Sequence, residues 1–419
     1  MKLTRRDFVT AAGAVTSASL LAGLESPLAA AEQPAAPMFP AAKRAVIISK
    51  YTGAQSMDGA YELMRRGGDT LDAALFMCKV QEDDPLDDSV GLGGLPNEEG
   101  VVELDACCMH GPTRRAGAVA GVHDIKNVGW LAKRVMERTD HLMLVGEGAT
   151  RFALAQGFPR ENLLTERSRK IWLLWKETMS NQDSWGPGLS DPNWKPPVAV
   201  PPQSRLEERK KEIEEVAAQL GIEPAFRQQA VERVLFPPTG TIHVSAVNEK
   251  GEMSGATTTC GLAWKIPGRV GDSAIIGAGC WTDQDVGSAG ATGRGEENIK
   301  VVGAHIIVEN MRRGMEPKEA GLDALKRIVR NFNGDMTRLR FVDMVYYILR
   351  RDGAYAGVSL WSHGSSGKPR NFAVHDGEKR TENCVALFQG SAISWPPTPT
   401  LPKSQPREAG DRSRTGNGF

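Results

Sequence analysis

Near the middle of the chain, a break in regular structure leads directly into a strand that begins on a hydroxyl residue. Prolines and a glycine fill the positions just before Thr241, and proline neither donates to a sheet nor continues a helix. From Thr241 to Val247 polar and apolar residues alternate, which predicts a half-buried strand. A Lys250-Gly251 turn and a second run over residues 253–259 predict its hairpin partner. Any fold of this chain must place Thr241 at the start of that hairpin.

The segments on both sides of this hairpin alternate between strand and helix patterns. Before it, β-branched or apolar runs predict strands at residues 45–49, 101–107 and 116–120. Helical spacing predicts helices there over residues 56–66, 69–77, 127–138, 150–156, 206–220 and 224–235. After it, the patterns predict helices at 296–313 and 317–330, and strands at 342–349, 355–360, 371–374 and 384–388. Such alternation favours a layered α/β arrangement of helices on sheets.

The overall charge argues against nucleic acid and membrane surfaces as partners. Lys plus Arg number 51 and Asp plus Glu also number 51, so the formal net charge is zero. No global field then attracts a polyanion, and a small neutral or zwitterionic partner fits better. The six cysteines include no Cys-x-x-Cys pair, so we expect no metal site and no cofactor.

Both ends of the chain and one internal stretch are predicted to lie outside the folded core. Paired Arg5 and Arg6, a short apolar run and a small-residue end near Ala31 are typical of a twin-arginine export signal over residues 1–31. The alternative is a tail with a chance arginine pair. The apolar run is too short to span a membrane, so we expect a periplasmic protein without membrane anchoring. Composition predicts a linker at 32–43, a Pro-rich exposed loop at 182–203 and a disordered tail at 396–419.

Thr241 could act as a nucleophile if the bond before it were cut. A threonine hydroxyl attacks poorly unless a base lies within hydrogen-bond reach, and an N-terminal threonine carries its own α-amine as that base. The reference pKa of such an amine is about 8, so a useful fraction is neutral at physiological pH. Gly240 tolerates the strained backbone that cleavage would need. The alternative is that Gly240-Thr241 merely starts a strand.

Three further groups of residues would suit one aspartyl substrate around this nucleophile. The partner strand ends in Thr258 and Thr259, so one of these hydroxyls could face it. Arg269 can clamp a carboxylate and Asp272 can hold an ammonium, although a surface ion pair has the same spacing. Residues 291–296 suggest a small-residue loop before a helix, able to stabilise an oxyanion with a hydroxyl and backbone N–H groups. The alternative for that loop is an ordinary helix cap.

The order and spacing of these motifs resemble the glycosylasparaginases (aspartylglucosaminidases), which are N-terminal nucleophile hydrolases. The resemblance covers roughly residues 44–388. After the junction it rests on Thr241-Ile, Ser254-Gly-Ala-Thr-Thr-Thr259, Gly261-Leu-Ala, Gly268-Arg-Val-Gly-Asp-Ser273, Ile276-Gly-Ala-Gly279 and Ala291-Thr-Gly293. Before the junction it rests on Asp88-Ser-Val-Gly-Leu-Gly-Gly94, Gly117-Ala-Val119, Ile125-Lys-Asn127 and Leu144-Val-Gly-Glu147.

The resemblance implies an α+β fold, a four-layer αββα sandwich, in which one domain is cut into two halves. Residues 44–240 would form the α-subunit half and residues 241–395 the β-subunit half. Self-cleavage between Gly240 and Thr241 would release the nucleophile. Members of the family usually assemble as dimers of cleaved αβ pairs, which we expect here as well.

The same resemblance implies roles for residues around the nucleophile. Thr259 matches the second threonine that supports it, and Ser89 matches a serine that contacts its amine from the other half. Thr292 and Gly293 match the oxyanion hole.

The substrate-binding positions also match, with three departures from the family pattern. Arg269 is implied to hold the substrate carboxylate, and Asp272 with the Gly295 carbonyl to hold its amine. The departures are Gly240, which replaces the aspartate of the family's His-Asp-Thr cleavage sequence, Tyr51, which replaces a tryptophan on the sugar side of the pocket, and His243, which replaces a glycine. Plant-type asparaginases also cut at Gly-Thr. On a strand His243 would point to the same side as Thr241, although a lone histidine is more often structural.

These features predict an exported amidohydrolase that cleaves the side-chain amide between asparagine and N-acetylglucosamine. An isoaspartyl dipeptidase or plant-type asparaginase is the alternative, because it uses the same aspartyl half and differs in the leaving group. A third hypothesis is an uncleaved periplasmic binding protein that retains the pocket.

Overall fold

Two β-sheets face each other, and the hairpin that begins near Thr241 lies at the centre of the larger one. The structure is a computed structural model that describes residues 37–179, 189, 191 and 203–393. The strands of the larger sheet, sheet A, are in spatial order β12 (Lys379–Asn383), β11 (Asn371–His375), β1 (Val46–Lys50), β5 (Thr239–Val247), β6 (Met253–Leu262), β2 (Leu104–His110), β3 (Arg115–Val122) and β4 (Met143–Val145). Those of sheet B are β13 (Val385–Ser391), β10 (Tyr355–His363), β9 (Met344–Arg350), β8 (Gly287–Gly293) and β7 (Cys280–Asp283).

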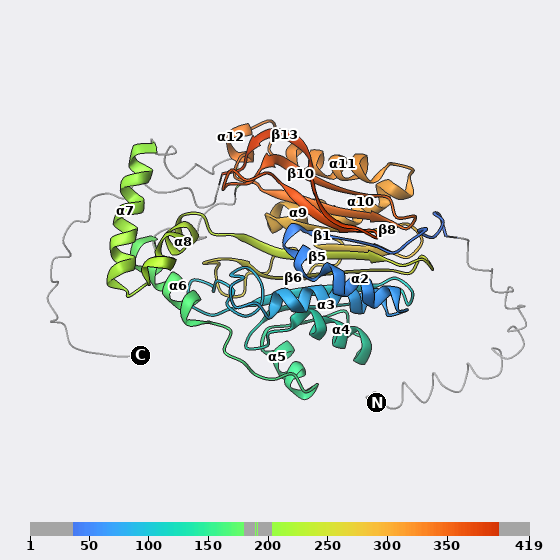
Figure 1. The fold of residues 1–419 in the computed structure, drawn as a ribbon, viewed down its shortest axis with the longest axis horizontal. Coiled ribbons are helices and arrows are strands. Elements are labelled where there is room, and N and C mark those ends of the chain that lie inside the picture. Colours follow the sequence, from blue (N-terminus) through green and yellow to red (C-terminus); the bar gives the residue numbers. More distant parts are fainter. Residues whose placement is uncertain (1–36, 180–188, 190, 192–202, 394–419) are drawn as a thin grey trace, which may run out of the picture. The chain divides into compact units, whose positions relative to one another are not determined.

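Helices cover the outer face of each sheet (Figure 1). On the side of sheet A lie the 3-10 helix η1 (Tyr51–Ser56) and α2 (Met57–Arg65), α3 (Thr70–Glu82), α4 (Val128–Arg138) and α5 (Gly146–Ala155). On the side of sheet B lie α9 (Gly295–Val301), α10 (Gly303–Arg312), α11 (Pro317–Arg330) and the short α12 (Met336–Leu339). In the parts of the chain that the structure describes, no helix is long and apolar enough to cross a membrane.

Successive side chains of β5 point to opposite faces of sheet A, so this one strand contributes to two cores. Ile242 and Val244 are fully buried in the core between sheet A and its helices. His243 lies between them in sequence and faces the opposite side, toward sheet B. A separate apolar cluster, which includes Ile48 of β1 and Tyr347 of β9, fills the space between the two sheets. Polar side chains of β5 therefore lie inside the protein, where they need hydrogen-bond partners.

The hairpin predicted at the centre of the fold is confirmed. β5 and β6 pair antiparallel, and β9 and β10 form the second predicted antiparallel pair. β5 starts two residues before Thr241, because Thr239 and Gly240 continue the ladder opposite Leu262 and Gly261. The α+β class implied by the resemblance is observed as well.

Two local predictions were wrong. The helix predicted over residues 296–313 is interrupted at Val302, whose φ of 50° is left-handed. The break brings Gly303 so close to its neighbours that an added Cβ would lie 2.2 Å from both Asn298 Oδ1 and Tyr346 Oη. The loop predicted at residues 291–296 begins as strand β8, and only residue 294 separates β8 from α9.

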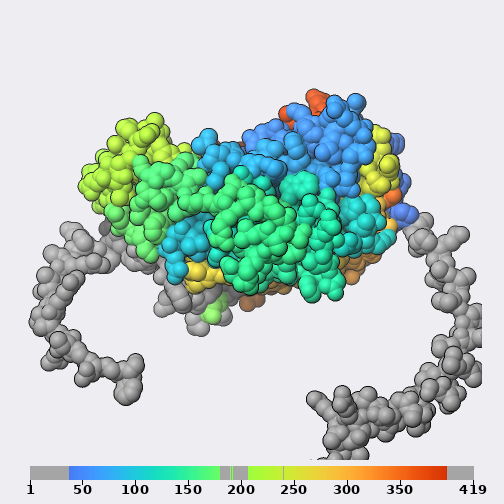
Figure 2. Space-filling model, turned by 90° about the horizontal axis from the view of Figure 1, so that it is seen from below, coloured from blue at the N-terminus to red at the C-terminus, as the bar shows by residue number. Residues whose placement is uncertain are grey.

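A helix that the sequence patterns did not predict, α6 (Glu166–Met179), forms a satellite core with α7 (Gln203–Gln219) and α8 (Pro224–Leu235). The three helices contact one another, and Figure 2 shows their green and yellow-green residues side by side. Trp175 of α6 stacks on Trp264, which follows β6, with ring centroids 4.9 Å apart. This cluster therefore supports the segment between β6 and the candidate substrate-binding residues. The Pro-rich stretch 182–203, the export signal and the tail lie largely or wholly outside the described residues.

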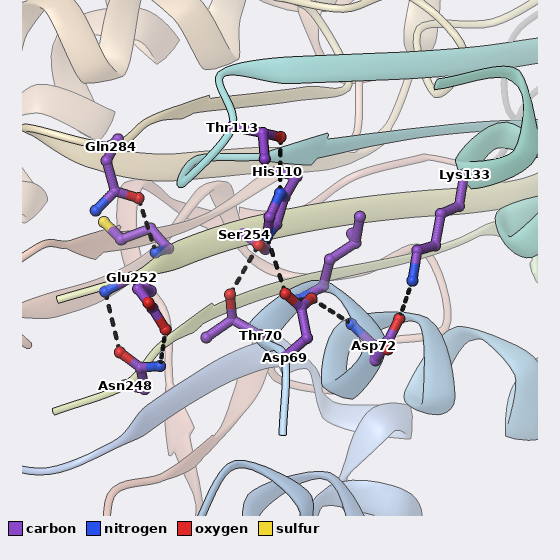
Figure 3. Close-up of polar contacts among 12 residues, drawn as sticks. Asp69, Thr70, Asp72, His110, Thr113, Lys133, Asn248, Glu252, Ser254 and Gln284 are labelled. Atoms are coloured by element: carbon purple, nitrogen blue, oxygen red, sulfur yellow. Dashed lines mark hydrogen bonds and ion pairs between the residues drawn. The ribbon is translucent and has the colours of Figure 1, made fainter. Parts of the chain in front are cut away.

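A cluster of polar side chains joins α3 to sheet A (Figure 3). The cluster lies at the end of β6 that is farther from Thr259. The Thr70 hydroxyl lies 2.8 Å from the Ser254 hydroxyl. Asp69 caps α3 by accepting from the Leu71 N–H at 2.7 Å, and its other oxygen lies 2.9 Å from His110 Nε2. The hydrogen bond with His110 and the cap bonds lower the pKa of Asp69 to about 2.

We predict that Asp69→Ala lowers the free energy of unfolding by about 1 kcal/mol, the usual cost of losing an N-cap. Because the folded-state pKa of Asp69 is depressed, its contribution is present above pH ~4 and is lost as the pH falls toward 2. Chemical denaturation at neutral pH measures the change. Asp69→Asn, which keeps the capping oxygen, should retain most of the stability. Equal destabilisation by the two variants would contradict the capping role.

Candidate active site

A β-bulge at Thr241 sets the geometry of the site. Gly240 pairs with Gly261 and Ile242 pairs with Thr258, so Thr241 alone faces two residues of β6, Thr259 and Cys260. A bulge of this kind bends the strand and redirects a side chain. Here it turns the hydroxyl of a buried threonine toward the backbone of the residue before it.

Two threonine hydroxyls converge on the carbonyl oxygen of Gly240. Thr241 Oγ1 lies 2.7 Å from that oxygen and 3.1 Å from Thr259 Oγ1. Thr259 Oγ1 also donates to the Gly240 carbonyl and accepts from the Gly261 N–H at 2.8 Å. Thr241 and Thr259 are 6% and 2% exposed, so water competes little for these bonds. The prediction that Thr259 faces Thr241 is confirmed.

Ser89 packs directly against Gly240. A Cβ built on Gly240 would lie 1.7 Å from Ser89 Cβ and 2.5 Å from Ser89 Oγ. The loop that carries Ser89 is fixed to the hairpin, because the Cys260 N–H donates to the Ser89 carbonyl at 3.1 Å. No side chain larger than that of glycine fits at position 240 in this arrangement. The close packing gives a physical reason why the aspartate of the family pattern is absent here.

Arg269 and Asp272 both lie at the site, but they do not form the simple pair that their spacing allows. Arg269 Nε donates to Glu296 Oε1 at 2.9 Å, whereas Asp272 accepts from Asn298 Nδ2 at 2.6 Å. Asp272 is 5% exposed, which excludes the surface ion pair. Burial raises the pKa of Asp272 to about 6, although Asn298 and the nearby Arg269 act in the opposite direction.

The predicted oxyanion-hole residues stand at the end of β8. Thr292 Oγ1 lies 2.9 Å from Tyr347 Oη, a bond that fixes the hydroxyl. Gly293 has φ of 128°, and an added Cβ would lie 2.1 Å from the Asp343 carbonyl oxygen, so glycine is required. The next glycine, Gly295, starts α9, where a Cβ would lie 2.9 Å from Asp272 Oδ1.

Two adjoining cavities collect these residues. The smaller, of about 10 Å³, is lined by Gly240, Thr241, Thr259, Arg269, Asp272, Gly293 and Gly295, among others. The larger, of about 820 Å³, is lined in part by Tyr51, Ser89 and Thr292 and shares Leu262 and Gly293 with the smaller one. Tyr51 is 47% exposed at this cavity. Every sequence-predicted site residue therefore lines one of two neighbouring spaces.

Comparison with known proteins gives a consistent result. Residues 50–339 match the asparaginase family. The chain belongs to this family. It is 35% identical over 378 residues to the N(4)-(β-N-acetylglucosaminyl)-L-asparaginase of Elizabethkingia miricola, covering 90% of this chain and 93% of that protein.

Two further relatives carry two different names. The chain is 31% identical to a probable isoaspartyl peptidase/L-asparaginase of Arabidopsis thaliana, over 75% of this chain and 84% of that protein. It is 32% identical to the rat N(4)-(β-N-acetylglucosaminyl)-L-asparaginase, over 68% of this chain and 76% of that protein. The chain is thus an enzyme of the glycosylasparaginase-like asparaginases, as its motifs suggested.

Several residues that support the site of this asparaginase were not found from sequence. Glu296, which holds Arg269, is an acidic residue in the first turn of α9, a position that also suits a helix N-terminus. Asn298 donates both to Asp272 and to the Ala278 carbonyl, and its own oxygen accepts from Tyr346. Only the tertiary fold reveals this role, because Tyr346 lies on a distant strand.

The hydrogen-bond partners of His243 in this enzyme are hydroxyls other than that of Thr241. Its ring nitrogens lie 2.8 Å from Thr257 Oγ1 and 2.7 Å from Ser245 Oγ, and the residue is fully buried between the sheets. The structural interpretation of His243 therefore holds. Over the residues that the structure describes, no group of three or more His, Cys, Asp or Glu side chains could hold a metal ion.

We predict that Gly240→Ala destabilises the uncleaved chain by about 1–3 kcal/mol or more, the cost typical of overpacking a tight core. The measurement is chemical denaturation in a Thr241→Ala background, which keeps the chain intact. Adding Ser89→Gly removes the two side-chain atoms that the new methyl group meets but leaves the Ser89 Cα 2.5 Å away, so it should restore part of the lost stability. If Ser89→Gly leaves the destabilisation by Gly240→Ala unchanged, contact with the Ser89 side chain is not its cause.

Proposed function

We propose that this asparaginase hydrolyses the side-chain amide that joins asparagine to N-acetylglucosamine, using Thr241 as an N-terminal nucleophile released by cleavage at Gly240-Thr241. The observation that carries the proposal is the convergence of the Thr241 and Thr259 hydroxyls on the Gly240 carbonyl. A hydroxyl that close to the preceding carbonyl suits an attack on it. The same hydroxyl, once its own amine is free, suits an attack on a substrate amide.

The reaction would proceed through a covalent intermediate. The free α-amine of Thr241 takes the hydroxyl proton while Oγ1 bonds to the amide carbon. Thr292 and the Gly293 N–H stabilise the oxyanion, and the C–N bond breaks as the leaving amine receives the proton. Water then attacks the resulting β-aspartyl ester, which releases aspartate and returns the proton to Oγ1. No step requires a metal or an organic cofactor.

The residues around the smaller cavity match the free ends of an asparagine. The Arg269 guanidinium suits the α-carboxylate, to which it can donate two hydrogen bonds. Asp272 and the Gly295 carbonyl suit the α-ammonium. A cavity of about 10 Å³ has room for about one water molecule. We therefore propose that cleavage is followed by movement of the residues that end in Gly240, which makes room for the aspartyl group.

The wider assembly follows from the same proposal. The helix-covered facing sheets would be the four-layer αββα sandwich of the N-terminal nucleophile hydrolases. Residues 44–240 and 241–395 would be its two halves, assembled as a dimer of cleaved pairs. Residues 1–31 would direct the folded enzyme to the periplasm by the twin-arginine route, without a membrane anchor or a nucleic-acid partner.

The second candidate is an isoaspartyl dipeptidase or plant-type asparaginase, favoured by Gly240 and by the name of the Arabidopsis relative. The larger cavity of about 820 Å³ beside the nucleophile offers space for a sugar leaving group. Turnover of N-acetylglucosaminyl-asparagine should therefore exceed that of β-aspartyl dipeptides when kcat/KM values are compared. The reverse preference would support the dipeptidase.

Thr241→Ala should abolish both cleavage and turnover, because it removes the hydroxyl used in each step. A denaturing gel of the wild-type enzyme should show two fragments that meet at Thr241, and the variant should give one intact chain. Thr178→Ala, a substitution on α6, serves as a control for handling and expression. An intact wild-type chain would support the uncleaved binding protein instead.

Substrate binding should depend on pH through Asp272. Its raised pKa means that the carboxyl is neutral below pH ~6 and charged above it, and only the charged form attracts an ammonium. We expect KM to rise as the pH falls from 7 to 5. Asp272→Asn should have a high KM with little dependence on pH over that range. A wild-type KM that is constant from pH 7 to 5 would contradict this role.

A further inference from the structure

Cleavage of the precursor needs a base that Thr241 itself does not yet possess. Before cleavage the Thr241 nitrogen belongs to a peptide bond, so it carries no free amine to accept the hydroxyl proton. The described partners of Thr241 Oγ1 are the Gly240 carbonyl and the Thr259 hydroxyl, and neither is a basic group. The imidazole of His243 is bonded to other hydroxyls. A base must therefore reach the junction from another segment.

One carboxylate approaches the junction through a single hydroxyl. Ser89 Oγ, which packs against Gly240, donates to Asp87 Oδ1 at 2.5 Å. The same Asp87 oxygen accepts from the Ser89 N–H at 2.9 Å, so the serine side chain and backbone are both oriented by this carboxylate. Asp87 therefore lies one hydrogen bond away from a hydroxyl that touches the residue whose carbonyl would be attacked.

The other side of Asp87 is also held in place. Its second oxygen accepts from Gln81 Nε2, and Gln81 in turn lies 3.0 Å from Thr52 Oγ1. Asp87 and Ser89 both line the cavity of about 820 Å³, which gives them access to water. The charged and titratable groups around Asp87 are Arg167 of α6, Arg233 of α8, Asp84 and Asp88 of its own segment and Cys260 of β6.

The neighbouring aspartate, Asp88, is paired with arginines. Asp88 is 3% exposed, accepts from Arg233 Nε at 2.5 Å and lies 3.7 Å from Arg167. Asp88 thus neutralises arginines, whereas the described hydrogen bonds of Asp87 come from Ser89 and Gln81, which are uncharged. Of the two, Asp87 has the chemistry of a base.

We propose that Asp87, acting through Ser89, promotes the self-cleavage of the precursor at Gly240-Thr241. This inference rests on the proposed function. In this step Thr241 Oγ1 leaves its present partners and bonds to the Gly240 carbonyl carbon, its proton passes to Ser89 Oγ, and Ser89 gives its own proton to Asp87. The C–N bond breaks, and the proton returns by the same route to the Thr241 nitrogen. Water then hydrolyses the ester, which leaves a Gly240 carboxylate and a free Thr241.

The decisive variant is Asp87→Asn. An asparagine side-chain oxygen can still accept from the Ser89 hydroxyl and N–H, so the local structure can be kept while the basic charge is lost. If Asp87 only shaped the loop, cleavage would proceed at the wild-type rate. If it acts as a base, cleavage should slow by a factor of about 10²–10⁴, the range of general-base assistance.

The measurement is the fraction of full-length chain that is cleaved with time after refolding from denaturant at a series of pH values, read on a denaturing gel. The cleavage rates of the wild type and Asp87→Asn are compared at each pH. Asp84→Asn is the matched control, because Asp84 lines the same cavity but accepts from the Leu86 N–H. It should be cleaved like the wild type.

Two further variants distinguish proton transfer through Ser89 from a purely structural role of Asp87. Ser89→Ala leaves the carboxylate in place but removes the hydroxyl, and it should also slow cleavage at least tenfold. Asp87→Glu keeps a base and should be cleaved faster than Asp87→Asn. Cleavage of Asp87→Asn or Ser89→Ala at the wild-type rate would overturn the inference. A wild-type chain that never cleaves at Thr241 would instead overturn the proposed function, so the two failures are distinguishable.

Discussion

The pairing of β5 with β6 is the constraint on which the site depends. One extra residue on β6 opposite Thr241 turns the threonine hydroxyls of both strands onto the Gly240 carbonyl. The hairpin in turn is held by the layers around it. On the helix side, Thr258 donates to the buried carboxyl of Glu82 at 2.7 Å, and Glu82 also accepts from the Gly129 N–H at the start of α4. On the other side, β5 and β6 contact strands of sheet B.

Burial and ion pairing together set the pKa values of the carboxyl groups around the candidate site. Burial opposes ionisation of Glu296, but Arg294 and Arg269 outweigh it and lower its pKa. Burial has the larger effect on Asp272, whose pKa rises. The site thus keeps one carboxylate charged between two arginines and leaves a second one that ionises near neutrality. An incoming ammonium would stabilise the charged form of Asp272, while a substrate carboxylate would compete with Glu296 for Arg269. Binding can therefore exchange existing contacts for substrate contacts without leaving a buried charge unpaired.

Much of this arrangement follows from the sequence, and the missing parts have identifiable causes. The β5–β6 hairpin was predictable because alternation and a Lys-Gly turn are local signals, and Thr241, Thr259, Arg269 and Asp272 follow from motif spacing.

The partner of Arg269 was not predictable, because Glu296 reaches it across the fold. The interruption of the helix at Val302 was missed because the close approach of Gly303 to Tyr346 that accompanies it is a tertiary contact. Helix α6 did have a local signal, since Ile171, Leu174 and Trp175 recur at helical spacing. The role proposed for Asp87 depends on the contact between Ser89 and Gly240, which no local pattern contains.

In the proposed mechanism, Thr241 becomes the N-terminal nucleophile of an aspartyl-transferring site. The most direct measurement is to quench the enzyme in acid during turnover of N-acetylglucosaminyl-asparagine and to map covalent adducts by peptide mass spectrometry. We expect an aspartyl adduct, linked as an ester, on the peptide that begins with Thr241. An adduct on any other side chain, or turnover by a chain in which Gly240 and Thr241 remain joined, would contradict it.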